Sequence, residues 1–345
     1  MTMTDARRKF TPRLADPNKP RLTTSAMIAS IAGEGQRTKP APFGHALVKL
    51  AQERPEVVGL TADLGKYTDM HVFSKAMPDR FYQMGMAEQL LMSAAAGLAR
   101  EGFMPFATTY AVFAARRAYD FICMAIAEEN LPVKIVCALP GLTTGYGPSH
   151  QATEDLAIFR GLPNLTIVDP CDALDIEEAV PAIADHPGPV YMRLLRGQVP
   201  LVLDEYDYRF ELGKAKILRE GEDVLFISAG LMTMRALDAA KELEKTGINA
   251  AVLHSPTIKP LDEASILAAV RAVPGRLVVV AENHTVIGGL GEAVAACLLR
   301  NGEAPRFRQI ALPDAFLDAG ALPTLHDLYG ISTGGIIKSV TAWTS

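Results

Sequence analysis

The sequence alternates short, wholly apolar runs with longer segments of helical periodicity. Strands that are apolar on both faces are buried on both sides, which is typical of a parallel sheet covered by helices. The chain therefore predicts an α/β fold. The expected strands lie at 57–64, 103–110, 131–139, 165–170 and 189–195, and the expected helices at 42–55, 87–102, 113–130 and 172–186.

The same rhythm restarts after a connector at 197–218, which contains Pro200 and several acids. A chain of 345 residues has room for two domains, each with its own core. We place the boundary near residue 205 and expect two doubly wound domains, at 39–204 and 205–345. The segment at 326–343 predicts one last helix.

Residues 1–38 differ from the rest, with seven Lys or Arg against three Asp or Glu. We interpret them as a basic arm that wraps a neighbouring subunit or stays mobile; a nucleic-acid-binding tail is the alternative.

The overall composition excludes several classes of protein. A net charge of −5 gives no reason to expect nucleic acid or an anionic membrane as a partner. Neither a membrane-spanning apolar run nor a secretory signal is found, so we expect a cytoplasmic protein. The four cysteines lack the close spacing of a metal or redox site, and buried thiols are expected. No metal site is expected on this chain.

One acid stands out because of its surroundings. Glu88 lies in the apolar run MGMAEQLLMSAAAGLA, where burying a carboxylate is costly. It is either held by backbone amides or an arginine for structural reasons, or available to hand a proton to a ring nitrogen of a bound cofactor.

Three further motifs offer ligand-binding groups. Tyr110 and Phe113 stand at the start of a helix and can present two rings to a flat heteroaromatic group, although such a pair also occurs in cores. His150, in GYGPSHQ, follows a buried strand, where ligands bind in parallel sheets. Arg193 and Arg196, in RLLRGQVP, suit an oxyanion of a substrate or a surface ion pair with the connector acids.

A glycine-containing motif later in the chain gives a weaker signal. ENHTVIGGLGEAV does not fit a dinucleotide-binding fingerprint. His284 has no neighbour at metal-ligand spacing and is expected to be structural.

GMAEQ, TYAVFAARRAYD, GPSHQ, RLLRGQVP and ENHTVIGGLGEAV, in this order, resemble the C-terminal half of transketolase, a thiamine diphosphate enzyme. The resemblance extends from about residue 39 to the end of the chain. It implies a pyrimidine-binding domain followed by a smaller transketolase C-terminal domain. The implied reaction moves a two-carbon ketol unit from a ketose to an aldose through the cofactor's ylide.

The resemblance also implies roles for individual residues. Glu88 matches the acid that bonds the N1′ nitrogen of the cofactor, and Tyr110 and Phe113 match the aromatic cradle of the same ring. Asp63 matches an acid at the contact between the two halves of the site. His150 matches a histidine that bonds donor hydroxyls, so both it and Glu88 are expected to be catalytic.

The substrate-binding residues are implied in the same way, and here the sequence departs from the family. Arg196 matches the arginine that holds a sugar phosphate. Tyr146 replaces an acid that contacts a sugar hydroxyl, Ala138 replaces a phosphate-binding histidine, and a phosphate-binding serine falls near Lys66 or Tyr67. These differences favour a non-standard sugar phosphate or a sulfonate.

The GDG motif that grips the diphosphate and a divalent metal, Mg or Ca, in the family is absent from the sequence. The resemblance therefore implies a separate N-terminal subunit that carries this motif, in an α2β2 assembly that is inactive without it. The alternatives are the beta subunit of a 2-oxoacid dehydrogenase and a non-catalytic assembly paralogue. Deoxyxylulose-phosphate synthase is a further relative.

Overall fold

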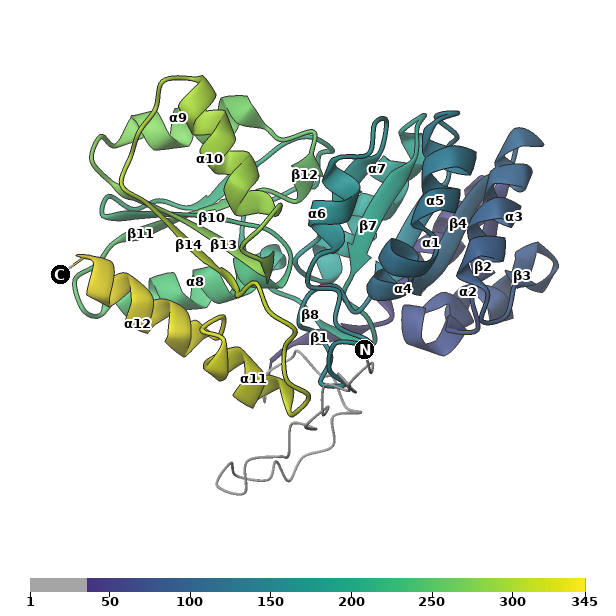
Figure 1. Cartoon of the computed structure of the whole chain (residues 1–345), viewed down its shortest axis with the longest axis horizontal. Helices are drawn as coiled ribbons and strands as arrows, with labels where there is room; N and C mark the ends of the chain where they lie inside the picture. Colours follow the sequence, from purple (N-terminus) through teal and green to yellow (C-terminus); the bar gives the residue numbers. More distant parts are fainter. Residues whose placement is uncertain (1–35, 345) are drawn as a thin grey trace, which may run out of the picture.

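The computed structural model describes residues 36–344, which form two α/β lobes that lie side by side (Figure 1). The expected basic arm lies almost wholly outside the described residues. The first lobe contains a seven-stranded sheet in the order β12-β6-β7-β5-β4-β2-β3. Its strands are β2 (Val57–Thr61), β3 (Phe81–Gln83), β4 (Met104–Tyr110), β5 (Lys134–Ala138), β6 (Thr166–Val168), β7 (Val190–Leu194) and β12 (Thr257–Lys259). All neighbouring pairs are parallel except β12 with β6.

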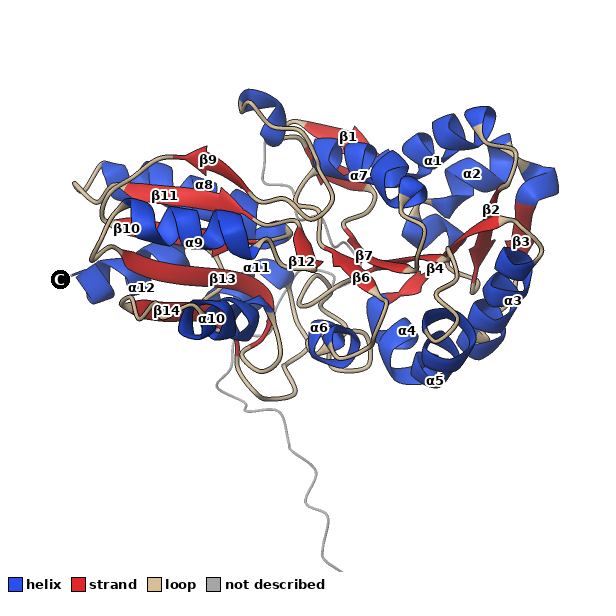
Figure 2. Ribbon diagram, turned by 90° about the horizontal axis from the view of Figure 1, so that it is seen from above, coloured by secondary structure: helices blue, strands red, loops and turns tan. Residues whose placement is uncertain are grey.

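Helices cover both faces of this sheet, as the sequence predicts (Figure 2). One face carries α1 (Pro42–Glu53), α2 (Met70–Ala76) and α7 (Ala173–Asp185). The other face carries α3 (Glu88–Arg100), α4 (Ala111–Arg117), α5 (Tyr119–Ile122) and α6 (Asp155–Arg160).

The second lobe repeats the arrangement with a five-stranded sheet in the order β14-β13-β10-β11-β9. Its strands are β9 (Lys216–Arg219), β10 (Val224–Ser228), β11 (Ala250–His254), β13 (Leu277–Thr285) and β14 (Phe307–Leu312). Only β9 runs antiparallel to its neighbour. Helices α8 (Leu231–Glu244) and α12 (Thr333–Thr344) cover one face, and α9 (Glu263–Ala272) and α10 (Leu290–Arg300) cover the other. The predicted α/β class with two parallel-sheet domains is confirmed.

The prediction of one long helix at 113–130 is wrong in detail. The chain forms α4, leaves helical geometry at Ala118 (φ −115°, ψ 9°), and resumes as α5 and a π-helical turn at Cys123–Ala127. The segment contains neither glycine nor proline, so local sequence gives no signal for the break. It coincides with the tertiary contacts of Arg116 and Arg117 at the end of α4, which outweigh helix propensity there.

The prediction of a single terminal helix at 326–343 is also wrong. Helix α11 (Leu322–Leu328) ends before α12 begins, because Gly330 adopts a left-handed conformation with φ 72°. The amide of Ile331 then donates to the carbonyl oxygen of His326 at 3.0 Å, as in a glycine-terminated helix.

Short strands in the connector and at the start of the first lobe are absent from the sequence-based expectation. β9 overlaps the end of the expected connector, and β1 (Thr38–Pro40) pairs with β8 (Gln198–Pro200) in a two-stranded antiparallel ribbon. Runs of three or four residues are too short to show a reliable period.

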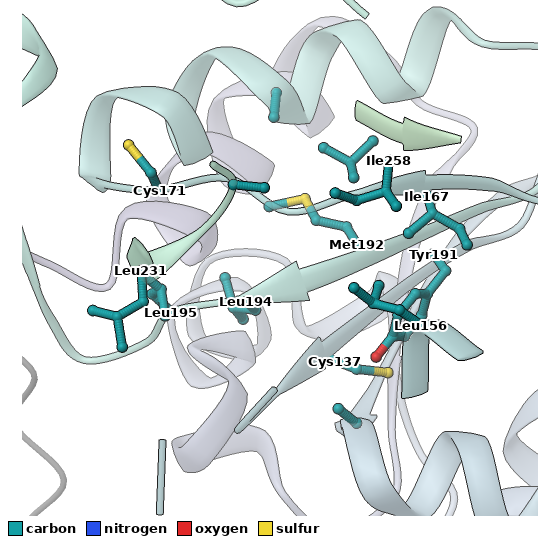
Figure 3. Packing of buried hydrophobic residues seen from close by; sticks show 14 of the residues in the cluster. Cys137, Leu156, Ile167, Cys171, Tyr191, Met192, Leu194, Leu195, Leu231 and Ile258 are labelled. Carbon is teal, nitrogen blue, oxygen red and sulfur yellow. The ribbon is translucent and has the colours of Figure 1, made fainter. Parts of the chain in front are cut away.

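The two lobes share one continuous core. Strand β12, from the sequence range of the second domain, pairs with β6 of the first-lobe sheet. Figure 3 shows Ile258 of this strand beside Ile167, and Leu231 of α8 beside Leu195. All four side chains are buried in the same cluster, so the lobes are packed together and not merely tethered.

A buried ion-pair network reinforces this junction. Arg193, in β7, is 1% exposed and donates two hydrogen bonds of 2.8 Å to Asp155 and one of 2.9 Å to Asp169. Its Nη2 also donates to the carbonyl oxygen of Asn283 in β13 at 3.1 Å. Burial raises the pKa of Asp155, but Arg193 outweighs this effect and leaves that pKa below its ordinary value. Arg193 is therefore internal, neither a substrate ligand nor a surface ion pair.

The cysteines carry free thiols, of which Cys137, Cys171 and Cys297 are buried and Cys123 is partly buried. Between residues 36 and 344, no helix is both long and apolar enough to span a membrane.

Candidate functional site

The topology of the first sheet brings most of the predicted site residues to one edge. Asp63, the loop that carries His150, and Arg196 follow the carboxyl ends of β2, β5 and β7, and Tyr110 is the last residue of β4. These four strands are neighbours in the sheet and run parallel. Their carboxyl ends therefore share the edge where ligands bind in such folds.

Three aromatic rings gather at this edge around the imidazole of His150. The imidazole centroid lies 6.1 Å from the ring of Tyr110, 5.5 Å from Phe113 and 5.2 Å from Tyr146. Tyr110 and Phe113 are themselves 5.5 Å apart. The structure thus joins the predicted aromatic pair, the predicted histidine and Tyr146 in one cluster.

The ring cluster has a defined electrostatic character. Burial, and then the charge of Arg117, lowers the pKa of His150 below its ordinary value, so the imidazole is neutral at pH 7. Its Nδ1 lies 2.9 Å from Oγ of Ser149. Burial raises the pKa of the Tyr110 phenol, which is therefore also neutral. The cluster offers uncharged hydrogen-bonding groups on an aromatic surface.

Glu88 is the first residue of α3 and is 3% exposed. Its Oε1 accepts a hydrogen bond of 3.0 Å from Nη1 of Arg117. The guanidinium carbon of Arg117 lies 3.7 Å from the centroid of the Phe113 ring. One arginine therefore connects the buried acid to the aromatic pair. The arginine contact foreseen for a structural Glu88 is present, and it places the acid beside the rings.

The loop that carries His150 is held by Arg116, the preceding arginine. Its Nη1 donates to the carbonyl oxygen of Pro148 at 2.7 Å and its Nη2 to that of Gln151 at 3.3 Å. The guanidinium also pairs with Glu154. The two arginines at the end of α4 thus fix the two sides of the site, one through the loop and the other through Glu88.

The second lobe supports the same loop from the opposite side. The side chain of Asn283 accepts a hydrogen bond of 2.9 Å from the amide of Leu142, whose carbonyl oxygen lies 2.7 Å from Nε2 of His326. The amide of Gly320 donates to the carbonyl oxygen of Gly145 at 2.9 Å. The described part of the second lobe therefore positions the His150 loop.

Gly147 is a point of close approach within this loop. It has φ 82°, and a Cβ atom there would lie 3.3 Å from the Cβ of Ala319. A larger residue would meet both backbone strain and the second lobe.

Arg196 lies beyond the end of β7, beside two residues of the segment after β2. Its guanidinium carbon lies 5.4 Å from the centroid of the Tyr67 ring. The carboxylate of Asp69 accepts hydrogen bonds of 3.0 and 3.3 Å from the amide of Gly197, the next residue. The Nε atom of Arg196 is shielded from solvent and has no hydrogen-bond partner within residues 36–344.

Asp63 stands apart from the ring cluster. It is exposed, adopts a left-handed conformation with φ 59°, and its amide donates to Oε1 of Gln83 at 2.7 Å. No hydrogen bond or ion pair within residues 36–344 joins it to Tyr110, and none joins it to Phe113.

Several residues around the site were not predicted from the sequence. Arg116 and Arg117 were visible as a basic pair but carried no assignment, and Asp69 and His326 gave no signal because their partners are distant in sequence. His284, expected to be structural, is buried and accepts a hydrogen bond of 3.2 Å from the amide of Ala157.

One group of possible metal ligands occurs among the described residues, and it includes none of the predicted site residues. Cys171, Asp175 and His254 are buried together. Their hydrogen bonds are already made: Asp175 accepts from the amide of Cys171 at 2.8 Å and pairs with His254 at 3.0 Å, and the other ring nitrogen of His254 meets Thr233 at 2.8 Å. This arrangement is that of a structural network.

The edge fits a flat heteroaromatic group that carries a ring nitrogen. Glu88 supplies a buried carboxylate, while Tyr110 and Phe113 supply an aromatic surface that Arg117 joins to it. Arg117 bonds Oε1 of Glu88, which leaves Oε2 for a ligand. An acid buried next to stacked rings is suited to an aminopyrimidine.

Comparison with protein families gives two matches that together cover most of the chain. The transketolase pyrimidine-binding domain matches residues 39–202, and the transketolase C-terminal domain matches residues 213–336. An uncharacterised transketolase family protein of Sinorhizobium fredii is 74% identical over 331 residues, which is 96% of each chain. The 6-deoxy-6-sulfo-D-fructose transketolase subunit SqwH of a Clostridium species is 40% identical over 85% of this chain and 90% of its own.

Two solved transketolase structures also superpose on this chain. A structure described as a split gene transketolase, inactive beta4 tetramer, superposes with a TM-score of 0.80 at 42% identity and covers 89% of this chain and 98% of its own. A transketolase from Campylobacter jejuni superposes with a TM-score of 0.74 at 18% identity, which shows the shared fold alone.

Proposed function

The chain belongs to the transketolase family in its split-gene form, and on this premise we propose that it is the C-terminal subunit of a two-chain transketolase. The proposed reaction transfers a two-carbon ketol unit from a ketose to an aldose. The observation that carries it is the cluster in which Arg117 joins the buried Glu88 to the aromatic pair, with the His150 ring 5.5 Å from Phe113.

Thiamine diphosphate, when bound, supplies the carbanion that accepts the ketol unit. Tyr110 and Phe113 would hold its pyrimidine ring, and Oε2 of Glu88 would hold a proton at the ring nitrogen. His150 is neutral, and Ser149 occupies its Nδ1, so Nε2 is the nitrogen that would meet a substrate hydroxyl. The aromatic walls would exclude water from these proton exchanges.

The diphosphate and its divalent metal, Mg or Ca, would be held mainly by a partner subunit in an α2β2 assembly. The split-gene neighbour and the relative named as a subunit support this division. The exposed Asp63 lies where such a partner could reach it. We propose that Asp63 faces the partner across the shared site.

The proposed substrates are sugars with a non-standard anionic end. Arg196 would bind this end, and its shielded, unpartnered Nε atom supports an oxyanion there. Tyr146 is 42% exposed beside His150 and would line the sugar's path. The relative named as a 6-deoxy-6-sulfo-D-fructose transketolase subunit supports a sulfonate as this end.

The proposal is tested with Glu88→Ala in the complex reconstituted from both subunits. Ketol transfer should fall at least about 100-fold, while assembly, followed by size-exclusion chromatography, stays intact. Glu129→Ala is the matched control, because Glu129 is a surface acid paired with Arg100. Activity that survives in the Glu88 variant would overturn the cofactor assignment.

Two further measurements test the division between subunits. Calorimetry should detect no thiamine diphosphate binding to this chain alone, and submicromolar affinity would contradict a shared site. A wild-type complex that assembles but transfers no ketol unit would instead identify a non-catalytic paralogue. No observation favours a 2-oxoacid dehydrogenase.

A further inference from the structure

Arg196 has an acidic neighbour that the sequence did not reveal. Asp69 is 1% exposed and lies between a 3₁₀ turn (Gly65–Thr68) and α2. Its two oxygens share the amide of Gly197, and the carbonyl oxygen of Gly197 accepts a hydrogen bond of 2.7 Å from Ala41. The turn that carries Arg196 is therefore fixed from both sides, with a buried carboxylate next to it.

Arg196 and Asp69 bring opposite charges to this turn. Arg196 carries one positive charge. This charge lowers the pKa of both the Asp69 carboxyl and the Tyr110 phenol, but burial raises each pKa by more. Burial raises the pKa of Asp69 to about 6, so the carboxylate is ionised at pH 8 and offsets the guanidinium. Two tyrosine rings lie at the same edge: the centroid of the Tyr67 ring is 5.4 Å from the guanidinium carbon of Arg196, and the Tyr146 ring is 5.2 Å from the ring of His150.

A pocket of this kind discriminates between anions by their charge. A sugar phosphate carries nearly two negative charges above pH 7, whereas a sulfonate carries one. In a partly buried site, a second negative charge near Asp69 is repelled and must also shed more tightly held water. A single negative charge is matched by the guanidinium of Arg196, whose Nε atom has no hydrogen-bond partner within residues 36–344.

We propose that Asp69 is a specificity-determining residue, which offsets the charge of Arg196 so that the enzyme selects a ketose with a singly charged oxyanion, such as a sulfonate, over a doubly charged phosphate. This inference rests on the proposed function, because it assigns Arg196 to the anionic end of the substrate. It narrows that function from any anionic sugar to one class.

The test uses the reconstituted two-subunit complex at pH 8 and three ketoses that differ only at carbon 6. Fructose 6-phosphate is a dianion, whereas 6-deoxy-6-sulfofructose and the methyl ester of fructose 6-phosphate are monoanions. For the wild type, kcat/KM should be at least about tenfold higher for both monoanions than for the dianion. A wild-type preference for the dianion would overturn the proposal without any variant.

Asp69→Asn then tests the residue itself. The amide oxygen of Asn can still accept from Gly197, so the turn is retained while the charge is lost. The phosphate-to-sulfonate ratio of kcat/KM should rise about tenfold. The same ratio should not change in the control Asp207→Asn, because Asp207 is a fully exposed acid in the connector. An unchanged ratio in the folded Asp69 variant would overturn the proposal.

Binding measurements separate this inference from the proposed function. Erythrulose as the donor and glyceraldehyde as the acceptor carry no charge, so their conversion to glycolaldehyde and a pentulose reports ketol transfer independently of the anion-binding residues. If neither is turned over, calorimetric titration of the same three ketoses still reports charge selection by the pocket. Tighter binding of the monoanions, reversed by Asp69→Asn, would support the inference even then, and tighter binding of the dianion would overturn it.

Discussion

Arg117 donates a hydrogen bond of 3.0 Å to Glu88 while its guanidinium carbon lies 3.7 Å from the centroid of the Phe113 ring. The side chain of Glu88 is almost fully buried, and that of Arg117 is half exposed. Arg117 therefore orients the proposed cofactor acid from the solvent side of the aromatic pair. The planar guanidinium can hydrogen-bond the carboxylate and stack on the ring at the same time, which a lysine could not do.

Replacing Arg117 should therefore impair both stability and turnover. Arg117→Ala leaves Glu88 buried without its partner, and we expect a loss of about 1–3 kcal/mol in the free energy of unfolding. Arg117→Lys should recover part of this stability but not the turnover, because it cannot stack and bond together. Urea unfolding and kcat of the reconstituted complex check this prediction. The control is Arg100→Ala, which removes a surface ion pair; equal effects at both positions would contradict it.

Replacing Arg116 should reduce the turnover of the substrate more than the stability of the fold. Arg116→Ala removes its bonds to the carbonyl oxygens of Pro148 and Gln151, so the loop that carries His150 loses one of its two supports. We expect kcat/KM for the ketose to fall by about 10–100-fold through misplacement of the histidine. Steady-state kinetics measures this loss. The prediction fails if Arg116→Ala is active while His150→Ala is not.

Arg193 should be the most costly arginine to replace in the described chain. Arg193→Met leaves Asp155 and Asp169 buried without their cation, and we expect the free energy of unfolding to fall by about 3–5 kcal/mol. Arg209→Met is the matched control, because Arg209 pairs with Glu178 but its side chain is 82% exposed. Chemical unfolding of both variants provides the comparison, and a similar cost for the two would refute the role of burial.

His326 should make the junction between the lobes sensitive to acid. Burial, and then Arg235, lowers the pKa of His326 to about 4, below the ordinary value of 6.5. The unfolded chain therefore binds more protons between these values, so this contribution to stability is complete above pH 6.5 and declines as the pH falls towards 4. At pH 5 the loss is about 2 kcal/mol.

His326→Gln provides the measurement for this prediction. A glutamine amide can still donate to the carbonyl oxygen of Leu142 and accept from Arg235, but it does not titrate. Between pH 7.5 and 5, the unfolding free energy of the wild type should therefore fall by about 2 kcal/mol more than that of the variant. Parallel curves for the two proteins would show that His326 does not contribute.

The sequence alone determined the α/β class and the alternation of helices with parallel strands. A strand that is buried on both faces contains few polar residues, so such strands can be recognised as apolar runs. It also drew attention to Glu88, the aromatic pair and His150, since an acid in an apolar helix and a histidine in a glycine-rich loop are both unusual. The broken helix after Arg117 and the turn at Gly330 escaped it, because the first depends on tertiary contacts and the second on a single glycine.

Only the tertiary structure decided which charged groups meet. Arg193 and Arg196 are three residues apart and look alike in the sequence, yet one is buried against Asp155 and Asp169 and the other lies at the edge beside Tyr67. Asp69 and Gly197 are 128 residues apart, and the parallel strands that separate them in sequence bring them into contact. Charge pairing acts through space at a few ångströms, so it depends on the packed sheet and not on spacing along the chain.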